Sequence, residues 1–101
     1  MKTYNINIHE SAEFDLFEIV DEKDGQLQGL GSKYYNKIRE RIFSLGNFPE
    51  RYPCFLDHAD LRVTYVFNYA IFYSVDKNDG IVNIIRIFPA KFGGEKMNKF
   101  L

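Results

Sequence analysis

Three consecutive segments that favour β-strands constrain the fold of this chain more than any other feature. They span residues 61–66, 69–75 and 81–88, and all three are rich in β-branched and aromatic residues. Such residues favour strands, and the short sequences between the segments contain the Asn, Asp and Gly that form turns. The pattern predicts an antiparallel three-strand meander. The last segment is apolar on both faces apart from Asn83 and Arg86, as expected of a central strand.

A further strand and two helices precede the meander. In residues 4–8, Tyr and Ile alternate with Asn, which is the period of a strand with one buried face. Ser11 is the predicted N-cap of a helix that has acids in its first turn and ends at Asp24-Gly25. A longer helix follows and ends at Gly46, since apolar residues recur there every three or four positions. Its start lies between residue 26 and Ser32.

Two segments are predicted to lack regular structure. Pro49 and Pro53 have no amide proton and restrict the residues before them, so a loop is expected up to about residue 60. The tail after Pro89 contains two adjacent glycines and three lysines. We expect residues 92–101 to be mobile, or ordered only against a partner.

These elements predict a single α+β domain that spans residues 1–101. The N-terminal strand and the meander form a four-strand sheet, and the two-helix hairpin packs on one face of it. The other face then needs polar side chains or a covering partner. The expected polar contributors are Arg62, Thr64, Ser74 and Arg86.

Composition argues against several classes of protein. No apolar stretch reaches the roughly 20 residues that a membrane helix needs, so no membrane partner is expected. The one cysteine, Cys54, excludes an intrachain disulfide and fits a reducing compartment, so we expect a cytoplasmic protein. The net charge is −1, from 7 basic and 11 acidic residues in 1–60 and 6 basic and 3 acidic residues in 61–101. This balance leaves a nucleic-acid target open.

Cysteine and histidine residues do not indicate a metal or cofactor site. His58 lies in a loop between Asp57 and Asp60, where such residues usually form turns, and no second ligand cluster exists. Cys54 has no charged residue within two positions, so a partly buried thiol is expected there. The acids of the first helix and the bases of the second are expected to form solvated faces, in preference to a binding site for a basic partner.

Several short sequences, in this order of elements, are typical of one family. They are Phe48-Pro49-Glu50-Arg51 after the second helix, Leu61-Arg62, the run 69–76, and Ile84-Ile85-Arg86-Ile87-Phe88. Together they resemble the RelE/ParE superfamily of toxins over nearly the whole chain. The resemblance implies the toxin of a type II toxin–antitoxin system, of the plasmid stabilisation type, which inhibits growth and is neutralised by a cognate antitoxin protein. The targets in this superfamily are DNA gyrase or the ribosome with its mRNA.

The two targets require different chemistry. Cleavage of RNA by its own 2′-hydroxyl needs cations that stabilise negative charge and groups that transfer protons. The resemblance implies Arg62, Arg86 and Lys91 as these candidate catalytic cations. However, Ala70 stands where RelE-like ribonucleases have an arginine, and Met97 stands where they have an aromatic hydroxyl. Two of the three expected ribonuclease positions are therefore not matched.

The ParE-like branch fits these residues best, because toxins that bind gyrase do not need the ribonuclease set. Pro89 also aligns with a histidine that many RelE-like relatives carry. Two alternatives stay open: a ribosome-dependent mRNA endonuclease, and a non-toxic relative that binds an antitoxin. Tyr34, Tyr35 and Phe43 follow helical spacing and are candidates for the core or for a homodimer contact before they are platforms for stacked bases.

Overall fold

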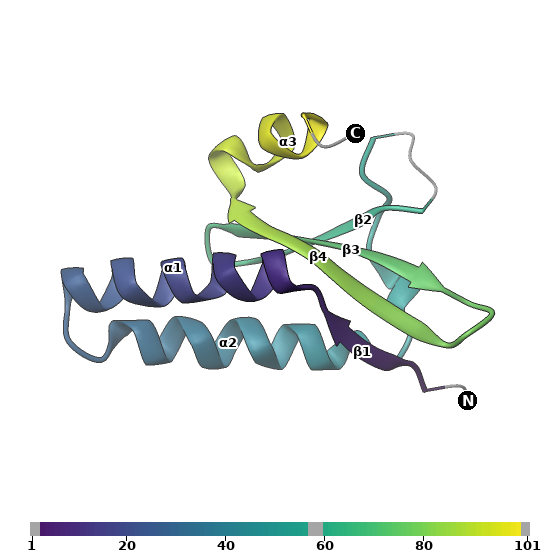
Figure 1. Cartoon of the computed structure of the whole chain (residues 1–101), viewed down its shortest axis with the longest axis horizontal. Coiled ribbons are helices and arrows are strands. Elements are labelled where there is room, and N and C mark those ends of the chain that lie inside the picture. Colours follow the sequence, from purple (N-terminus) through teal and green to yellow (C-terminus); the bar gives the residue numbers. More distant parts are fainter. Residues whose placement is uncertain (1–2, 57–59, 100–101) are drawn as a thin grey trace.

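A four-strand sheet lies between a pair of long helices and a short C-terminal helix. The computed structural model describes residues 3–56 and 60–99. The elements are, in order, β1 (Asn5–Ile8), α1 (Glu10–Gln26), α2 (Leu30–Ser44), a 3-10 helix (Pro49–Arg51), β2 (Arg62–Val66), β3 (Tyr69–Asp76), β4 (Ile81–Pro89) and α3 (Ala90–Asn98). The antiparallel pair α1 and α2 lies on one side of the sheet, and α3 lies on the other (Figure 1).

The sheet is mixed, with the strand order β1-β4-β3-β2. β2, β3 and β4 form the antiparallel meander that the sequence predicted, and β4 is a central strand. β1 pairs with β4 in parallel, from Asn5 opposite Ile81 to Ile8 opposite Ile84. The α+β class and the four-strand sheet are therefore confirmed.

The helical hairpin closes through Gly31, near the start of α2. The amide of Gly31 donates a hydrogen bond of 2.8 Å to the Asp24 carboxylate. A Cβ atom at position 31 would lie 2.6 Å from the carbonyl oxygen of Val20, which is closer than real Cβ atoms approach. Glycine is therefore required where α2 crosses the end of α1.

The start of α1 differs from the prediction by two residues. His9 is the N-cap in place of Ser11, and its Nδ1 atom accepts a 3.3 Å hydrogen bond from the Ser11 amide. A histidine side chain thereby satisfies an amide that the first turn of a helix leaves without an intrahelical partner. α1 also continues through Gly25 to Gln26.

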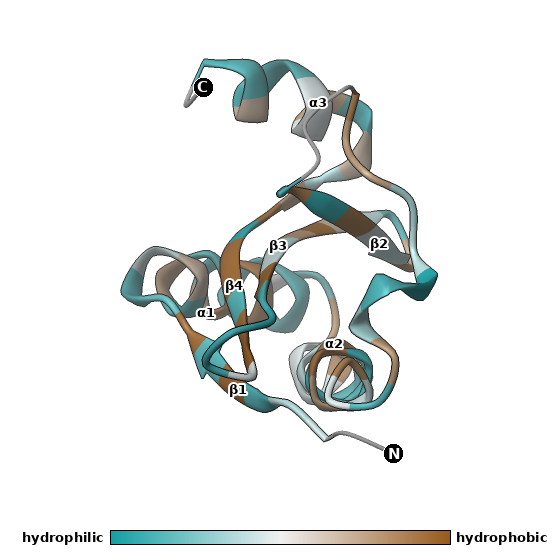
Figure 2. Ribbon diagram, turned by 90° about the vertical axis from the view of Figure 1, so that its right-hand side faces the viewer, coloured by the Kyte–Doolittle hydropathy of each residue, from teal (hydrophilic) through white to brown (hydrophobic). Residues whose placement is uncertain are grey.

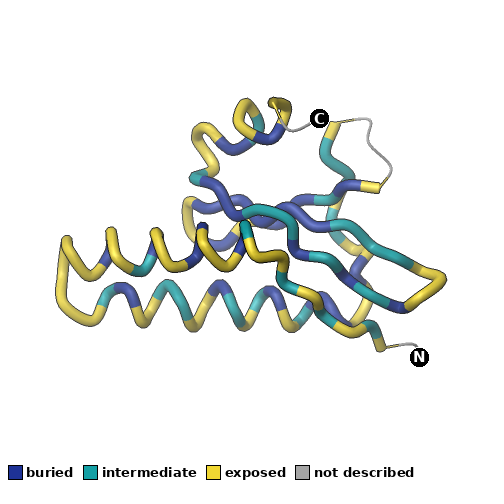
Figure 3. The backbone as a smooth tube through the Cα atoms, in the orientation of Figure 1, coloured by how far each residue is buried: buried dark blue, intermediate teal, exposed yellow. Residues whose placement is uncertain are grey.

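Two apolar clusters lie on opposite faces of the sheet. The larger cluster lies under the hairpin and includes Ala12, Leu16, Ile19, Ile38, Ile42, Leu45, Val66, Tyr69, Ile71, Tyr73, Val82, Ile84 and Ile87. The smaller cluster lies under α3 and consists of Leu61, Val63, Ala70, Phe72, Phe88 and Met97, with Phe55 and Ile85 packed against it. Figure 2 shows the largely apolar strands β3 and β4 between the helical hairpin and α3. Figure 3 shows buried positions along the strands of the sheet.

The second cluster corrects the expectation of a polar outer face. Thr64 is 1% exposed and aligns with Ile71 of the hairpin-side cluster, and Arg62 lies opposite Tyr73 of the same cluster. The polar side chains of β2 therefore face the hairpin side, and Val63 faces α3. Prediction failed here because alternation gives the two faces of a strand but not which face lies under which helix.

The C-terminal segment also differs from the expected tail. Residues 90–98 form α3, in which Met97 is 3% exposed. A Cβ at Gly93 would lie 3.4 Å from the Cβ of Ala70 and 3.5 Å from that of Phe88, so the helix approaches the sheet closely at this glycine. Tertiary packing overrides the weak helix propensity of Gly93 and Gly94.

Replacing Met97 by alanine tests whether α3 is part of the core. We expect Met97→Ala to lower the free energy of unfolding by about 2 kcal/mol, because a buried methionine is lost and a cavity remains. The exposed Asn98→Ala variant in the same helix serves as the control and should change stability by less than about 0.5 kcal/mol. Urea denaturation measures both values. Equal, small effects of the two changes would show that α3 does not contribute to the core.

Candidate functional site

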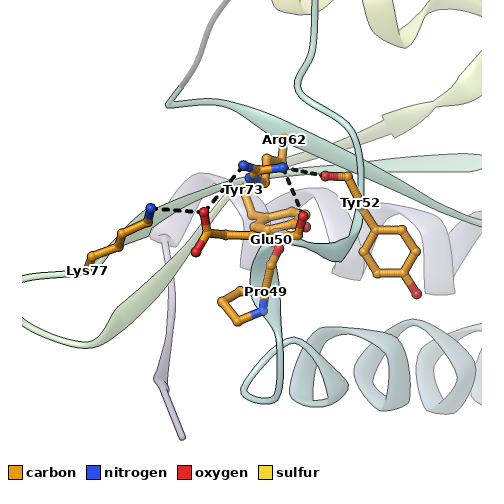
Figure 4. A network of polar contacts seen from close by, with 6 residues as sticks. All are labelled: Pro49, Glu50, Tyr52, Arg62, Tyr73 and Lys77. Carbon is orange, nitrogen blue, oxygen red and sulfur yellow. Dashed lines mark hydrogen bonds and ion pairs between the residues drawn. The ribbon is translucent and has the colours of Figure 1, made fainter. Parts of the chain in front are cut away.

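Arg62, the first of the sequence-predicted cations, lies at the start of β2 and holds the loop that follows α2. Its Nη1 atom donates to the carbonyl oxygens of Glu50 at 3.1 Å and Tyr52 at 2.6 Å. Its Nη2 atom lies 3.7 Å from the Glu50 carboxylate, which also pairs with Lys77 at 3.0 Å. Figure 4 shows Glu50 between the two cations. The guanidinium is thus engaged by three acceptors of one segment.

An open, polar cavity of about 810 Å³ lies beside this network. Arg62, Lys77 and Glu50 line it, together with Cys54, Asp60 and Asp76. Both signs of charge are present, and Glu50 already neutralises part of the positive charge. The half-buried state of Cys54 agrees with the prediction of a partly buried thiol.

Tyr73 holds the 3-10 helix 49–51 against the sheet. Its hydroxyl donates a 2.6 Å hydrogen bond to the carbonyl oxygen of Pro49, and its side chain is fully buried (Figure 4). Burial disfavours the phenolate and raises the pKa of Tyr73 from 10.0 to about 12, against a smaller opposing effect of Arg62. A neutral, hydrogen-bonded Tyr73 therefore fixes the position of the Phe-Pro-Glu-Arg segment on the sheet.

Arg86, the second predicted cation, forms an ion pair with α1. Its Nε and Nη2 atoms each donate to the Asp15 carboxylate at 2.8 Å, and the Ile87 amide donates to the same carboxylate at 2.9 Å. Asp15 is 6% exposed and the Arg86 side chain 20%. Hydrogen bonding to Asp15 raises the pKa of the Arg86 guanidinium. The bidentate geometry is the strong form of an arginine–carboxylate contact.

A bulge in β4 sets the face of the sheet on which Arg86 lies. Phe72 pairs with Arg86 while Tyr73 pairs with Ile84, so Ile85 has no partner in the ladder. Alternation would place Arg86 on one face with Val82, Ile84 and Phe88, but Val82 and Ile84 belong to the hairpin-side cluster and Phe88 to the α3-side cluster. Because the bulge shifts the parity of the strand by one residue, Arg86 shares the α3-side face with Phe88, whose ring centroid lies 4.5 Å from the guanidinium, but not with Val82 and Ile84. It meets Asp15 at the edge of β4, beyond the end of β1.

Lys91, the third predicted cation, lies exposed on α3, with its ammonium 5.4 Å from the ring centroid of Phe92. Arg62 lines the large cavity, whereas Arg86 lines a second cavity of about 260 Å³ between α1, β4 and α3. Lys91 lines neither cavity. The structure therefore places the three residues in three different surroundings.

The two positions that do not match a RelE-like ribonuclease lie together in the α3-side cluster. Ala70 is 1% exposed, and Met97 of α3 packs in the same cluster. The Cβ of Ala70 lies so close to Gly93 that a Cβ added at position 93 would be 3.4 Å away, which is van der Waals contact. An arginine at this position would require α3 to move. Positions 70 and 97 themselves supply neither a cation nor a hydroxyl, and the cations nearest to this cluster are Arg86 and Lys96, 4.5 and 5.5 Å from the ring centroid of Phe88.

Sequence reasoning missed Asp15 as the partner of Arg86. A signal was present, since Asp15 falls on the same buried side of α1 as Ala12 and Ile19, where an acid needs a partner. Glu50 and Lys77 have no such signal, because the loop brings them together only in three dimensions.

His58 lies outside the described residues. Within residues 3–56 and 60–99 no cluster of His, Cys, Asp or Glu is suited to a metal ion, and no helix has the length and apolarity to span a bilayer.

The arrangement of elements is that of a RelE/ParE-like toxin. The chain is similar to the chromosomal ParDE toxin–antitoxin system from P. aeruginosa, with a TM-score of 0.73 and 15% identity over 86% of this chain and 96% of that chain. It is also similar to the RelBE2 toxin–antitoxin complex from Mycobacterium tuberculosis, with a TM-score of 0.68 and 20% identity over 89% and 95% of the two chains. An E. coli RelE mutant in the free state gives a TM-score of 0.66 and 15% identity over 98% and 99%.

At such low sequence identity, these structural similarities establish the fold alone. The family is established by a family model. The model of the ParE toxin of type II toxin–antitoxin systems matches residues 6–92. The chain therefore belongs to the ParE toxin family. A comparison with curated proteins gives no match.

Removal of the Tyr73 hydroxyl tests the anchor of the 49–51 segment. Tyr73→Phe should cost about 1 kcal/mol of stability, because the hydrogen bond to Pro49 is lost. The folded pKa of Tyr73, about 12, lies above its unfolded value of 10.0, so its contribution is complete below pH 10 and is lost as the pH rises through 12. Urea denaturation at pH 8 to 12 should therefore show a shallower alkaline loss for Tyr73→Phe than for the natural chain. Parallel curves would contradict the assignment.

Replacement of Asp15 tests the link between α1 and β4. Asp15→Ala leaves the Arg86 guanidinium and the Ile87 amide without their acceptor, so we expect a loss of about 3 kcal/mol in the free energy of unfolding. Glu13→Ala is the matched control on the exposed side of α1 and should change stability by less than about 0.5 kcal/mol. A loss below about 1 kcal/mol for Asp15→Ala would show that the pair does not hold the hairpin on the sheet.

Proposed function

We propose that this chain is a toxin that inhibits growth by binding a macromolecular target such as DNA gyrase, without cleaving RNA. Membership of the ParE toxin family supports the toxin role. The observation that carries the mechanism is the packing of Ala70 and Met97 against Gly93 and Phe88, where a ribonuclease of the RelE kind would need polar groups. Binding of a target needs a shaped surface and no proton transfer.

The engagement of the two arginines within the chain supports the same conclusion. Arg62 donates to loop carbonyls and Arg86 donates to a nearly buried carboxylate. Each guanidinium would have to leave these acceptors before it could take a phosphate. A bidentate partner at 2.8 Å makes such an exchange costly.

A cognate antitoxin protein is the proposed neutralising partner, and the proposed compartment is the cytoplasm. Two of the similar solved structures are toxin–antitoxin complexes by name, the M. tuberculosis RelBE2 complex and an archaeal RelE–RelB complex from Pyrococcus horikoshii, with a TM-score of 0.60 for the latter. By analogy, this chain is expected to bind an antitoxin encoded beside it and to stabilise the replicon that carries the pair.

A ribosome-dependent mRNA endonuclease is the second candidate. The exposed Lys91 favours it, since it offers positive charge to a phosphate backbone. In that mechanism Arg62, Arg86 and Lys91 stabilise the charge of the cleaved phosphate. A relative that binds an antitoxin but has lost toxicity is the third.

Induced expression in a bacterial host distinguishes these functions. We expect growth arrest, intact mRNA and altered plasmid supercoiling, and rescue when the adjacent antitoxin is expressed. Lys91→Ala should arrest growth to the same extent, because a binding toxin does not use this cation for catalysis. Arrest with mRNA cleaved at ribosome-bound codons, and loss of cleavage in Lys91→Ala, would establish the endonuclease instead. No arrest by protein shown to be folded would establish the non-toxic relative.

A further inference from the structure

The outer face of α1 carries an exposed stripe that the fold does not use. Glu10, Glu13, Phe14, Phe17 and Asp21 recur at spacings that place them on one side of a helix. All five are exposed, with 62% of Phe14 and 63% of Phe17 accessible to solvent. Two phenylalanines on the side opposite the buried stripe are not needed for the core. Exposed residues follow this side of α1 in Figure 3.

This stripe borders α2. Val20 and Asp24 contact Gly31, so their side of α1 faces α2. Phe17 precedes Asp24 by two helical turns and therefore lies on the same flank. On α2, Tyr35 follows Gly31 by about one turn and so lies toward the same flank, and Arg39 and Phe43 follow Tyr35 at intervals of four residues. The two helices thus present one continuous outer face.

Aromatic rings continue across this face onto α2. The Arg39 guanidinium lies 5.4 Å from the ring centroid of Tyr35 and 4.9 Å from that of Phe43, which is 49% exposed. We call the α1 stripe together with Tyr35, Arg39 and Phe43 the hairpin surface. Exposed aromatic side chains and arginine are the residue types that dominate protein–protein contacts.

The charge of the hairpin surface indicates its partner. Glu10, Glu13 and Asp21 form no ion pair with any other described residue, and Arg39 is the one cation of this surface. Lys23, the only cation of α1, is buried, with its ammonium 5.0 Å from the ring centroid of Tyr34. It therefore does not neutralise the outer acids. The surface is an apolar strip with a net negative charge.

We propose that the hairpin surface binds a basic amphipathic helix of another protein. Apolar side chains of that helix cover Phe14 and Phe17, and its lysines or arginines pair with the flanking acids. Nucleic acid is repelled by these acids, and a second copy of this chain would bring two acidic stripes together. None of the hairpin surface residues lines the cavity beside Arg62 or the cavity beside Arg86. The inference is therefore independent of the proposed toxic mechanism.

The test measures binding of two labelled synthetic peptides to the purified full chain by fluorescence anisotropy. Both peptides carry leucines at helical spacing, flanked by lysines in one and by glutamates in the other. We expect the lysine peptide to bind at least about tenfold more tightly than the glutamate peptide, and less tightly as salt increases. Phe17→Ser should weaken its binding by about tenfold, and Glu13→Lys should weaken binding and reduce its salt dependence.

Matched controls lie elsewhere on the chain. Phe92→Ser removes an exposed phenylalanine of α3, and Glu40→Lys reverses an exposed charge on α2 outside the hairpin surface. Neither should change binding more than about twofold. Equal binding of both peptides, or equal losses in Phe17→Ser and Phe92→Ser, would overturn the proposal. So would a dimer in sedimentation experiments that Phe17→Ser abolishes. Should Phe17→Ser fail to fold, Asp21→Lys provides the same test.

Discussion

The bidentate ion pair between Asp15 and Arg86 joins the helical hairpin to the sheet at the point where the sheet loses a strand. β1 ends at Ile8, opposite Ile84, so β4 continues beyond it without a partner on that side. Asp15 accepts hydrogen bonds both from the Arg86 guanidinium and from the Ile87 amide, and so takes the place of the missing strand. Without it, the Ile87 amide would lose its acceptor and the Arg86 guanidinium its bidentate partner. The position of α1, and through Gly31 that of α2, depends on this contact.

The same constraint limits what the arginines of this chain can do. Because both faces of the sheet are buried, an arginine side chain can be accommodated only at the ends or edges of the strands. At both places other residues of the chain accept hydrogen bonds from the guanidinium. Arg62 closes the Phe-Pro-Glu-Arg loop onto β2, and Arg86 closes α1 onto β4. α3 completes the enclosure, because Gly93 allows it to pack directly on Ala70. The arrangement favours rigid surfaces for binding over mobile cations for catalysis.

The sequence was sufficient for the features that local periodicity determines. The meander and the two long helices follow from alternation and from the 3.6-residue repeat, because each is set by which side of one element is buried. The family resemblance rested on the same segments. What periodicity could not provide were the bulge at Ile85, where the residues are apolar on both faces, and α3, whose glycines read as helix breakers until their approach to the sheet is known.

The site residues divide in the same way. Arg62, Arg86 and Lys91 stand out in a sequence, but their partners do not, since Glu50 and Lys77 are 27 residues apart and Asp15 is 71 residues from Arg86. Asp15 was the exception that could have been found, because an acid on the buried side of α1 has to be paired.

α1 combines three separate tasks on two sides of one helix. Its apolar stripe packs against the hairpin-side core, Asp15 binds β4, and the stripe from Glu10 to Asp21 faces solvent. The only lysine of the helix is directed inward to Tyr34 and Tyr69, which leaves the outer acids unopposed. Because the residues of the outer stripe are exposed, substitutions there should leave the folding free energy almost unchanged. Effects of such substitutions on partner binding can then be attributed to the surface itself and not to the stability of the fold.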